Sequence, residues 1–262
     1  MHKARKRFGQ HFLHDKNIIA KILDAIDPQR DDNLLEIGPG QGALTYPLLQ
    51  RCGQLTAVEL DRDLVSSLRE KSQDHGDLEV INADILKFNL DDLPSNKRVR
   101  VVGNLPYNIS TPLMFHLMKS IENIQDMHFM LQKEVALRIV ATENSRDYGR
   151  LSVMLQYFCR CQYLFDVAPG CFTPPPRVDS AIIRLHPHLE PVAEVGDFTL
   201  FSNIVQTAFG QRRKTIVNAL KTRVAPELFD ACHIDKNLRA ENLSLSDFAR
   251  LSRATYQRQY DA

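Results

Sequence analysis

A glycine-rich segment near the start of the chain has the residue types of a ligand-binding loop. It runs from Glu36 to Gly42 as Glu-Ile-Gly-Pro-Gly-Gln-Gly, where an apolar run ends and a helical pattern begins. Glycines at such a junction let the backbone turn tightly and approach a nucleotide or amino-acid ligand closely. Gly38-x-Gly40-x-x-Ala43 satisfies a dinucleotide fingerprint, whereas Gly38-x-Gly40-x-Gly42 is the spacing associated with S-adenosylmethionine enzymes. The loop alone leaves the choice between these cofactors open.

Acidic side chains follow the next two predicted strands. Glu59 ends the apolar run 55–60, about twenty residues after Gly38, where a carboxylate can accept hydrogen bonds from both hydroxyls of a ribose. Asp84 follows the run 78–81, and its carboxylate could accept a hydrogen bond from an adenine amino group. Because the carboxyl ends of neighbouring parallel strands converge on one crevice, we expect the loop and both carboxylates to share a site.

A fourth predicted strand is followed by Asn104-Leu105-Pro106-Tyr107, whose residue types suit chemistry on an aromatic amine. Such an amine is a weak nucleophile because its lone pair is delocalised into the ring, so the site needs hydrogen-bond acceptors. The Asn104 side-chain oxygen and the Leu105 carbonyl can stabilise positive charge on the nitrogen, since Pro106 biases Leu105 toward an extended conformation. Tyr107 offers a ring face to an extruded base. This is the Asn/Asp-Pro-Pro-Tyr-type pattern of amino-methyltransferases, with Leu105 in place of the first proline.

The spacing of apolar residues predicts a large α/β unit followed by a helical one. An amphipathic helix is expected over 16–27, with Asp15 as its N-cap. Short apolar runs then alternate with helical patterns, which is typical of a parallel sheet with crossover helices; the runs are 34–37, 55–60, 78–81, 99–102 and 128–131. Two further strands, 153–165 and 178–185, are expected to pair antiparallel at the sheet edge.

The same pattern predicts two domains. The catalytic domain is expected over 1–190, of which 1–30 form a basic arm and a helix. From 191 to 262 the apolar spacing is helical, and a boundary is indicated by Pro187, Pro191 and Gly196. We therefore predict a small all-α domain at the C-terminal end of the chain.

The composition indicates a folded protein without a membrane anchor. The 262 residues are 44% hydrophobic and 25% charged, which excludes collagen-like and wholly disordered chains. No apolar run approaches the roughly 18 residues that span a bilayer, and no hydrophobic signal core follows the basic N-terminus, so we expect a cytoplasmic protein. The cysteines form no Cys-x-x-Cys pair, so reduced thiols and no metal are expected; they are Cys52, Cys159, Cys161, Cys171 and Cys232.

Basic residues gather in two distant stretches, although the net charge is only +1. On a helical projection of 205–223, Val205 and Leu220 belong to an apolar stripe from which Lys214 and Lys221 face away. Such a helix can pack and touch phosphates, whereas a solvated surface is the alternative for each stretch. The residues expected to contact a polyanion are Arg5, Lys6, Arg7, Arg212, Arg213, Lys214 and Lys221.

Segments spread over nearly the whole chain carry a resemblance to a known family. The two most specific are Asn104 to Phe115 and the triple-proline segment from Phe172 to Ser180; the others are 5–13, 36–42, 58–61, 130–135, 148–153 and 209–215. Together they resemble the bacterial KsgA (RsmA) family of ribosomal RNA adenine N6-dimethyltransferases, which is related to the Erm antibiotic-resistance methyltransferases. The resemblance implies an α/β fold: a Rossmann-like S-adenosylmethionine-dependent methyltransferase sheet with an antiparallel edge hairpin, plus the small helical domain.

The resemblance also implies roles for individual residues. The segment 9–13 corresponds to the part of the family that closes over the methyl donor, and His11 stands where the pattern usually has Asn. Phe172 corresponds to the aromatic residue that stacks on the target base opposite Tyr107. The residues expected to bind the donor are His11, Leu13, Gly38, Gly40, Gly42, Glu59, Asp84 and Asn104. Those expected to act on the base are Asn104, Leu105, Pro106, Tyr107 and Phe172.

The implied reaction is transfer of methyl groups from S-adenosylmethionine to N6 of two adjacent adenosines in the 3′-terminal hairpin loop of small-subunit (16S) ribosomal RNA. The expected partner is this RNA or the immature 30S subunit, and the expected state is a metal-free monomer. An Erm-type large-subunit methyltransferase and a non-catalytic ribosome-assembly or transcription factor stay open as alternatives. The triple-proline segment and Arg212-Arg213-Lys214 disfavour the first, and the intact Asn104 motif disfavours the second. The Asn104 motif would have no role in a nicotinamide dehydrogenase, so this class is disfavoured.

Overall fold

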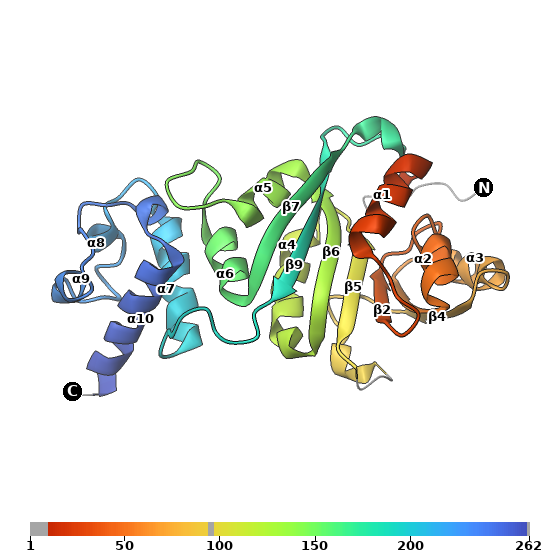
Figure 1. The fold of residues 1–262 in the computed structure, drawn as a ribbon. Coiled ribbons are helices and arrows are strands. Elements are labelled where there is room, and N and C mark those ends of the chain that lie inside the picture. Colours follow the sequence, from red (N-terminus) through yellow and green to blue (C-terminus); the bar gives the residue numbers. More distant parts are fainter. Residues whose placement is uncertain (1–9, 94–96, 261–262) are drawn as a thin grey trace. The chain divides into compact units, whose positions relative to one another are not determined.

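The computed structural model describes residues 10–93 and 97–260, and in it the chain forms two compact units (Figure 1). The first unit comprises Met1–Ala136 with Gln162–Pro187, and the second comprises Leu137–Cys161 with His188–Ala262. The second unit thus takes one segment from the middle of the chain, which a single division by composition does not anticipate. The domain bounds 1–190 and 191–262 stay a prediction.

A seven-stranded sheet has the strand order β4-β3-β2-β5-β6-β9-β7. Its strands are β2 (Asn33–Ile37), β3 (Gln54–Glu59), β4 (Asp77–Asn82), β5 (Val99–Asn104), β6 (Ile124–Gln132), β7 (Cys159–Val167) and β9 (Ser180–Pro187). The pairs β3–β4, β2–β3, β2–β5 and β5–β6 are parallel, and β9 is antiparallel to β6. The predicted parallel sheet with an added antiparallel strand is therefore confirmed.

A helix follows each of the strands β2, β3, β5 and β6. These helices are α2 (Thr45–Cys52), α3 (Arg62–Ser72), α4 (Ser110–Leu117) and α5 (Lys133–Val140), with short 3-10 turns at Leu90–Asp92 and Met118–Asn123. The first five residues of β5 are buried, as expected for a central strand covered on both faces. This covering leaves the ends of the strands as the positions where polar side chains can meet a ligand.

Helix α1 (Lys16–Ile26) confirms the predicted amphipathic helix. The Asp15 carboxylate accepts hydrogen bonds from the main-chain N–H groups of Asn17 and Ile18, which caps the first turn. The helix ends at Asp27, which has a left-handed backbone and donates its N–H to the carbonyl of Leu23. Its buried face joins the hydrophobic core of the first unit, so α1 fixes the segment that precedes it.

A second, two-stranded sheet joins distant parts of the first unit. Strand β1 (Phe12–Leu13) pairs antiparallel with β8 (Phe172–Thr173), with Phe12 opposite Thr173 and Leu13 opposite Phe172. The main-chain N–H of His14 donates to the carbonyl of Cys171 at 3.0 Å and continues the pairing. The predicted donor-closing segment 9–13 is thereby tied to the triple-proline segment.

The second unit is helical apart from the start of β7. It contains α6 (Arg150–Phe158), α7 (Phe198–Gly210), α8 (Ile216–Ala219), α9 (Glu227–Ala231), a 3-10 turn at Ala240–Asn242 and α10 (Leu245–Tyr260). Its core holds the buried rings of Tyr148, Phe201, Phe229 and Phe248. In the described part of the chain, no helix is both long enough and apolar enough to cross a membrane.

Two predictions about secondary structure were wrong. The strand expected over 153–165 is helix α6 up to Phe158, and strand β7 begins only at Cys159. The residues from Leu151 to Leu155 are all buried, and a helix buried on all sides has no periodic pattern to distinguish it from a strand. The Ser152 hydroxyl, which accepts from the N–H of Gly149, marks where this helix starts.

The continuous helix projected over 205–223 is also interrupted. Helix α7 ends at Gly210, and the short helix α8 starts only after Thr215. Thr215 forms an isolated antiparallel bridge with Arg239, and the N–H of Ile216 donates to the carbonyl of Leu238. These tertiary hydrogen bonds hold an extended residue where the apolar spacing alone predicts a helix.

Candidate active site

A cavity of about 370 Å³ lies where four parallel strands end. Its lining comes from the N-terminal segment 10–13, the loop after β2, the end of β3, residues 83–85 after β4 and residues 104–109 after β5. The volume falls in the range of small-molecule sites. The structure therefore brings together the groups that the sequence predicted at successive strand ends.

The glycine loop has a backbone that only glycine adopts easily. Gly38, Gly40 and Gly42 have φ angles of 66°, 58° and 88°, which lie in the left-handed region. A Cβ at Gly42 would also overlap the ring of Tyr46. The N–H of Gly38 donates to the carbonyl of Val58 at 2.9 Å, which ties the loop to β3. The first two glycines line the cavity, whereas Gly42 lies outside the lining and is needed for the turn.

Glu59 presents a buried carboxylate at the end of β3. Its Oε2 accepts from the N–H of Gly40 at 3.1 Å and its Oε1 from the N–H of Asp61 at 2.8 Å. Burial raises the pKa of Glu59, and these two hydrogen bonds oppose the shift. Each carboxylate oxygen retains a second lone pair, so the group can still accept hydrogen bonds from hydroxyls in the cavity.

Glu36 is a second buried carboxylate, at the start of the loop. Its Oε2 accepts from the hydroxyl of Thr45 at 2.6 Å. Burial raises the pKa of Glu36 to about 8, the Thr45 hydrogen bond opposes this shift, and the nearby charge of Glu59 adds to it. Glu36 belongs to the glycine-rich sequence pattern, but that pattern predicts no role for it, because burial beside another acid leaves no signal in the sequence.

Asp84 lines the cavity on the far side of β3 from β2. Its Oδ1 accepts from the N–H of Leu86 at 3.0 Å, so the residue forms a turn as well. Its Oδ2 can accept a further hydrogen bond from a ligand. The predicted ligand role and the turn role are thus compatible.

The orientation of the Asn104 amide is fixed by the N-terminal segment. Its Nδ2 donates to the main-chain carbonyl of His11 at 3.1 Å, so Oδ1 is left as the acceptor. The N–H of Leu105 donates to the carbonyl of Met130 at 3.1 Å, which holds this residue at the end of β5. Asn104 and Leu105 both line the cavity. The two acceptors predicted for an aromatic amine therefore lie side by side along the chain.

The ring of Tyr107 is held from two sides. Its hydroxyl lies 2.8 Å from the hydroxyl of Ser180, which is buried at the start of β9. Burial raises the pKa of Tyr107, and the Ser180 hydrogen bond opposes the shift. The imidazole of His11 stacks on the Tyr107 ring with 5.8 Å between centroids. Ser180 was not predicted as a site residue, although it is the last residue of the triple-proline segment.

Phe172 does not line this cavity. Its side chain is 3% exposed and packs in the core with Leu13 and Ile182. Strand β8 turns the ring inward because Phe172 pairs with Leu13 across the small sheet. Leu13 is buried in the same core and reaches the cavity. The stacking role of Phe172 stays a prediction that would require its ring to leave the core.

The predicted RNA-binding residues differ in whether the structure describes them and in the contacts that they make. Arg5, Lys6 and Arg7 lie outside the described residues. Arg212 donates to the carbonyls of Arg146 and Tyr148 and to the Glu241 carboxylate, so it joins elements of the second unit. Arg213 and Lys214, after α7, and Lys221, after α8, are exposed.

The cysteines are free thiols, and two of them are hard to ionise. Burial raises the pKa of Cys161 to about 12, and burial also raises that of Cys159, with a further contribution from the nearby Cys161. Among residues 10–93 and 97–260, no three His, Cys, Asp or Glu side chains are grouped so as to hold a metal ion. Cys52, Cys159 and Cys232 are buried and pack as small apolar residues, and Cys161 and Cys171 are half-buried.

Four strand ends together define a class of protein. The first carries glycines, the second a carboxylate, the third an acidic turn and the fourth an Asn-Leu-Pro-Tyr segment. They fit S-adenosylmethionine, because Gly38 and Gly40 leave room beside the backbone while Glu59 and Asp84 provide acceptors for ribose and adenine. The fold and site are those of an S-adenosylmethionine-dependent methyltransferase.

Comparison with known proteins narrows this class. The family model "Ribosomal RNA adenine dimethylase" matches residues 1–257, and the chain belongs to this family. It is 52% identical over 253 residues to "Ribosomal RNA small subunit methyltransferase A" of Nitrosococcus oceani, covering 96% of each chain. It is 53% identical over 250 residues to the protein of the same name from Coxiella burnetii, covering 95% of this chain and 96% of the relative.

Solved structures confirm the fold. A dimethyladenosine transferase from Plasmodium falciparum superimposes with a TM-score of 0.79 at 26% identity, covering 92% of this chain and 96% of that one. The 23S rRNA methyltransferase ErmE gives a TM-score of 0.73 at 28% identity, covering 94% and 99%. The expected α/β fold and the expected family are both confirmed.

Proposed function

We propose that this chain transfers methyl groups from S-adenosylmethionine to N6 of two adjacent adenosines in the 3′-terminal hairpin loop of small-subunit ribosomal RNA. One observation carries the proposal: the Asn104 amide donates to His11, so its oxygen is turned to accept from an amine at the cavity. The identity of about 52% to small-subunit methyltransferases supports this RNA over the large-subunit RNA of ErmE, which is 28% identical.

The donor site and the base site have separate residues. Gly38 and Gly40 would face the amino-acid end of the donor, Glu59 its ribose and Asp84 its adenine. When bound, S-adenosylmethionine supplies a methyl group on a positively charged sulfur, which an amine can attack directly. Glu59 and Asp84 orient rather than react, since each already accepts a main-chain hydrogen bond that fixes its carboxylate.

The base site acts by position and electrostatics. Asn104 Oδ1 and the Leu105 carbonyl accept the hydrogens of the adenine amino group and stabilise the positive charge that develops on N6. Tyr107, anchored by Ser180, offers its ring face to the extruded base. The alkylated amine is acidic, so water can take its proton and no side chain needs to act as a strong base.

The exposed cations of the second unit supply RNA affinity in this proposal. Arg213, Lys214 and Lys221 are exposed, so their charges can reach phosphates without breaking internal ion pairs. We assign Arg212 a structural role instead, because it bonds to Glu241 and to two carbonyls. The N-terminal basic residues Arg5, Lys6 and Arg7 belong to the same proposal.

The cellular setting is part of the proposal. We propose that the immature 30S subunit in the cytoplasm is the substrate, that the enzyme acts as a monomer without a resident metal, and that catalysis belongs to the domain 1–190. The resemblance of the whole chain to the KsgA family supports each of these points. Helical residues 191–262 would then serve RNA binding.

A labelled-methyl transfer assay tests the function. Small subunits isolated without this modification are incubated with the protein and labelled S-adenosylmethionine, and the RNA nucleosides are analysed by mass spectrometry. We expect N6-dimethyladenosine confined to the 3′-terminal hairpin. Label in large-subunit RNA instead would favour an Erm-type enzyme. Binding of donor and subunit without any methylation would favour an assembly factor.

A further inference from the structure

The last turn of helix α1 is held by two arginines of the sheet. Arg184 donates from Nη2 to the carbonyl of Ala25. Arg100 donates from Nη2 to the carbonyl of Ile26 at 2.6 Å and from Nη1 to that of Asp27 at 3.3 Å. Helix α1 has no basic side chain in its own last turn, where the free carbonyls carry partial negative charge. The sheet therefore supplies the cations that this end of the helix lacks.

The orientation of the Arg184 side chain is fixed by a buried histidine. Arg184 lies on β9 opposite His128 of β6, and its Nε donates to His128 Nε2 at 2.8 Å. Burial lowers the pKa of His128 to about 4, Asp126 opposes this shift and the two arginines add to it. The imidazole is therefore neutral near pH 7, and its Nε2 remains an acceptor. One guanidinium thus connects β6, β9 and the end of α1, all within the first unit.

The other end of α1 adjoins the cavity. Residues 10–13 line the cavity and precede Asp15, which caps the helix. The main-chain carbonyl of His11 accepts from Asn104 Nδ2 at 3.1 Å, and His11 Nδ1 lies 2.7 Å from the carbonyl oxygen of Pro174. The 11 residues of α1 span about 16 Å. The helix therefore joins the turn that the arginines hold to the segment that orients the Asn104 amide.

The hydrogen bonds at its last turn fix where α1 lies along its own axis. The buried face of the helix packs in the hydrophobic core through Ile22, Leu23 and Ile26. Apolar packing is non-directional, so it holds the helix against the sheet more strongly than it fixes its axial position. Hydrogen bonds to main-chain carbonyls are directional and do fix that position. A helix released at this turn would carry the His11 carbonyl away from Asn104.

We propose that Arg184 is a positioning residue for methyl transfer: it holds the last turn of α1 and thereby places the His11 carbonyl that orients the Asn104 amide. This inference rests on the proposed function. Arg184 lies outside the cavity lining, so it acts through the helix and not on the reactants. Without it, the Asn104 amide can turn its nitrogen toward the amine, and an acceptor for N6 is lost. Arg100 shares the contact with α1 but also balances two buried carboxylates, so its replacement changes stability as well.

A double-mutant cycle tests this route. The rate of methyl transfer at saturating S-adenosylmethionine and small subunits is measured for Arg184→Met in the wild-type and Asn104→Ala backgrounds. Arg184→Met should lower the wild-type rate about 10- to 100-fold, because a small displacement of a catalytic group has an effect of this size. In Asn104→Ala it should lower the rate less than about threefold, because the group that it orients is already absent. The Kd for small subunits should stay within about threefold of the wild type.

Arg69→Met is the control for loss of a similar bond. Arg69 Nη2 donates to the carbonyl of Val80 at 2.6 Å and joins α3 to β4 in the same unit, so this variant also loses a guanidinium bond between a helix and a strand. Its transfer rate should stay within about threefold of the wild type. Hydrogen exchange gives a second readout that needs no activity. The peptide 10–26 should exchange about 3- to 10-fold faster in Arg184→Met and at the wild-type rate in Arg69→Met.

Equal losses of rate in the two backgrounds would overturn the proposal, because they would show a general loss of stability. An Arg184→Met rate equal to the wild type, or unchanged exchange of the peptide 10–26, would also reject it. Where Arg184→Met does not fold, Arg184→Lys keeps the positive charge without the planar fork and should show the same pattern with a smaller loss. Methylation of small subunits by the wild type establishes the proposed function separately, and the exchange result stands whether or not methylation is found.

Discussion

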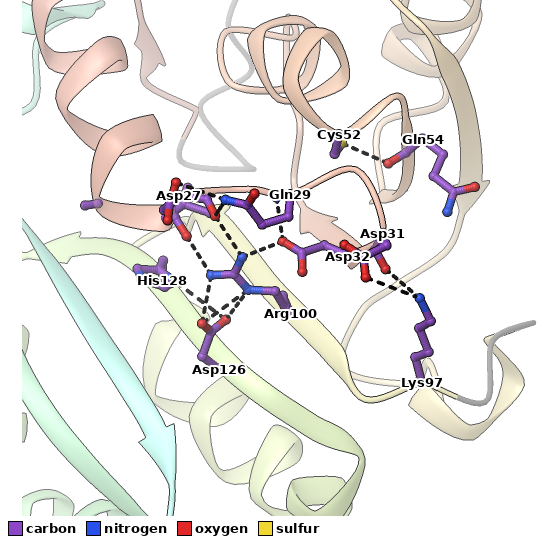
Figure 2. Close-up of polar contacts among 12 residues, drawn as sticks. Asp27, Gln29, Asp31, Asp32, Cys52, Gln54, Lys97, Arg100, Asp126 and His128 are labelled. Atoms are coloured by element: carbon purple, nitrogen blue, oxygen red, sulfur yellow. Dashed lines mark hydrogen bonds and ion pairs between the residues drawn. The ribbon is translucent and has the colours of Figure 1, made fainter.

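Strand β5 carries a polar side chain near each end, and the two are used in opposite ways. Near its start, the buried Arg100 guanidinium donates to the carboxylates of Asp126 and Asp32 and to the main-chain carbonyls of Ile26 and Asp27 (Figure 2). At its end, Asn104 makes one hydrogen bond, from Nδ2 to His11, and its acceptor oxygen is turned to a cavity. The hydrogen-bonding groups of Arg100 are satisfied inside the protein, whereas the side-chain oxygen of Asn104 is available to a ligand.

The buried carboxylates show the same contrast. Asp126 lies beside Arg100, 2.9 Å from its Nη2, so its negative charge is balanced inside the protein. Burial raises the pKa of Glu36 to about 8, the Thr45 hydroxyl opposes this shift, and the neighbouring carboxylate of Glu59 adds to it. At the end of the sheet where Arg100 lies, opposite charges are paired and stabilise the fold. At the end with the cavity, the buried acidic side chains are not balanced by positive charge.

Replacing Arg100 should have the largest effect. Arg100→Met leaves Asp126 and Asp32 buried without a cation, and we expect a loss of about 3–5 kcal/mol in the free energy of unfolding, measured by urea denaturation. The matched control is Arg51→Met at the exposed pair with Asp24, which should lose less than about 1 kcal/mol. Equal losses in the two variants would break the comparison.

Replacing Asn104 should affect catalysis more than folding. Asn104→Ala removes an acceptor for the developing charge on N6, so the rate of methyl transfer should fall about 10²- to 10³-fold. RNA affinity and the urea midpoint should change little, because the lost internal bond is a single one to His11. Unchanged turnover in the labelled-methyl assay would remove Asn104 from the mechanism.

The buried acid at the cavity end should make stability depend on pH. The pKa of Glu36 is raised to about 8 in the folded protein from 4.5, so the folded state holds a proton that the unfolded state releases. Stability is therefore lost as the pH rises from about 4.5 through 8, by on the order of 5 kcal/mol. Glu36→Gln should lack this loss in urea denaturation without ligands. A parallel pH profile in both proteins would contradict the assignment.

The smallest effect is expected from exposed cations. Arg213→Ser with Lys214→Ser removes two exposed charges, so the plot of log affinity for RNA against log salt should flatten by about one to two units. Stability should not change measurably. Arg212→Ser is the contrasting variant, since it breaks the bond to Glu241 and should lower stability as well. An unchanged salt slope would return Arg213 and Lys214 to a purely solvating role.

Sequence patterns predicted the fold where the spacing of the apolar residues agrees with the position of the motifs at strand ends. The alternation of apolar runs with helical spacing gave the parallel strands, and the strand ends then placed Gly38, Glu59, Asp84 and Asn104 on one cavity. Apolar spacing failed at two places. Within helix Arg150–Phe158 the residues 151–155 are all buried, so no periodic pattern marks the helix, and Thr215 is extended because it pairs with Arg239.

Side-chain partners could not be predicted in the same way. Nothing in the spacing connects Arg100 with Asp126, or His11 with Pro174, because these contacts depend on how strands far apart in sequence align. Phe172 is a further example, since its place in the core depends on the pairing of β8 with β1, which lie far apart in sequence.

The pairing of β1 with β8 has a consequence for synthesis on the ribosome. Residues 12 and 13 leave the ribosome long before their strand partners, residues 173 and 172. A nascent chain that ends at residue 136 already contains every strand-end group of the donor site, but it lacks the strand that pairs with its N-terminal segment. The pairing that fixes residues 12 and 13, and with it the pocket, is therefore completed only after residues 172 and 173 have emerged.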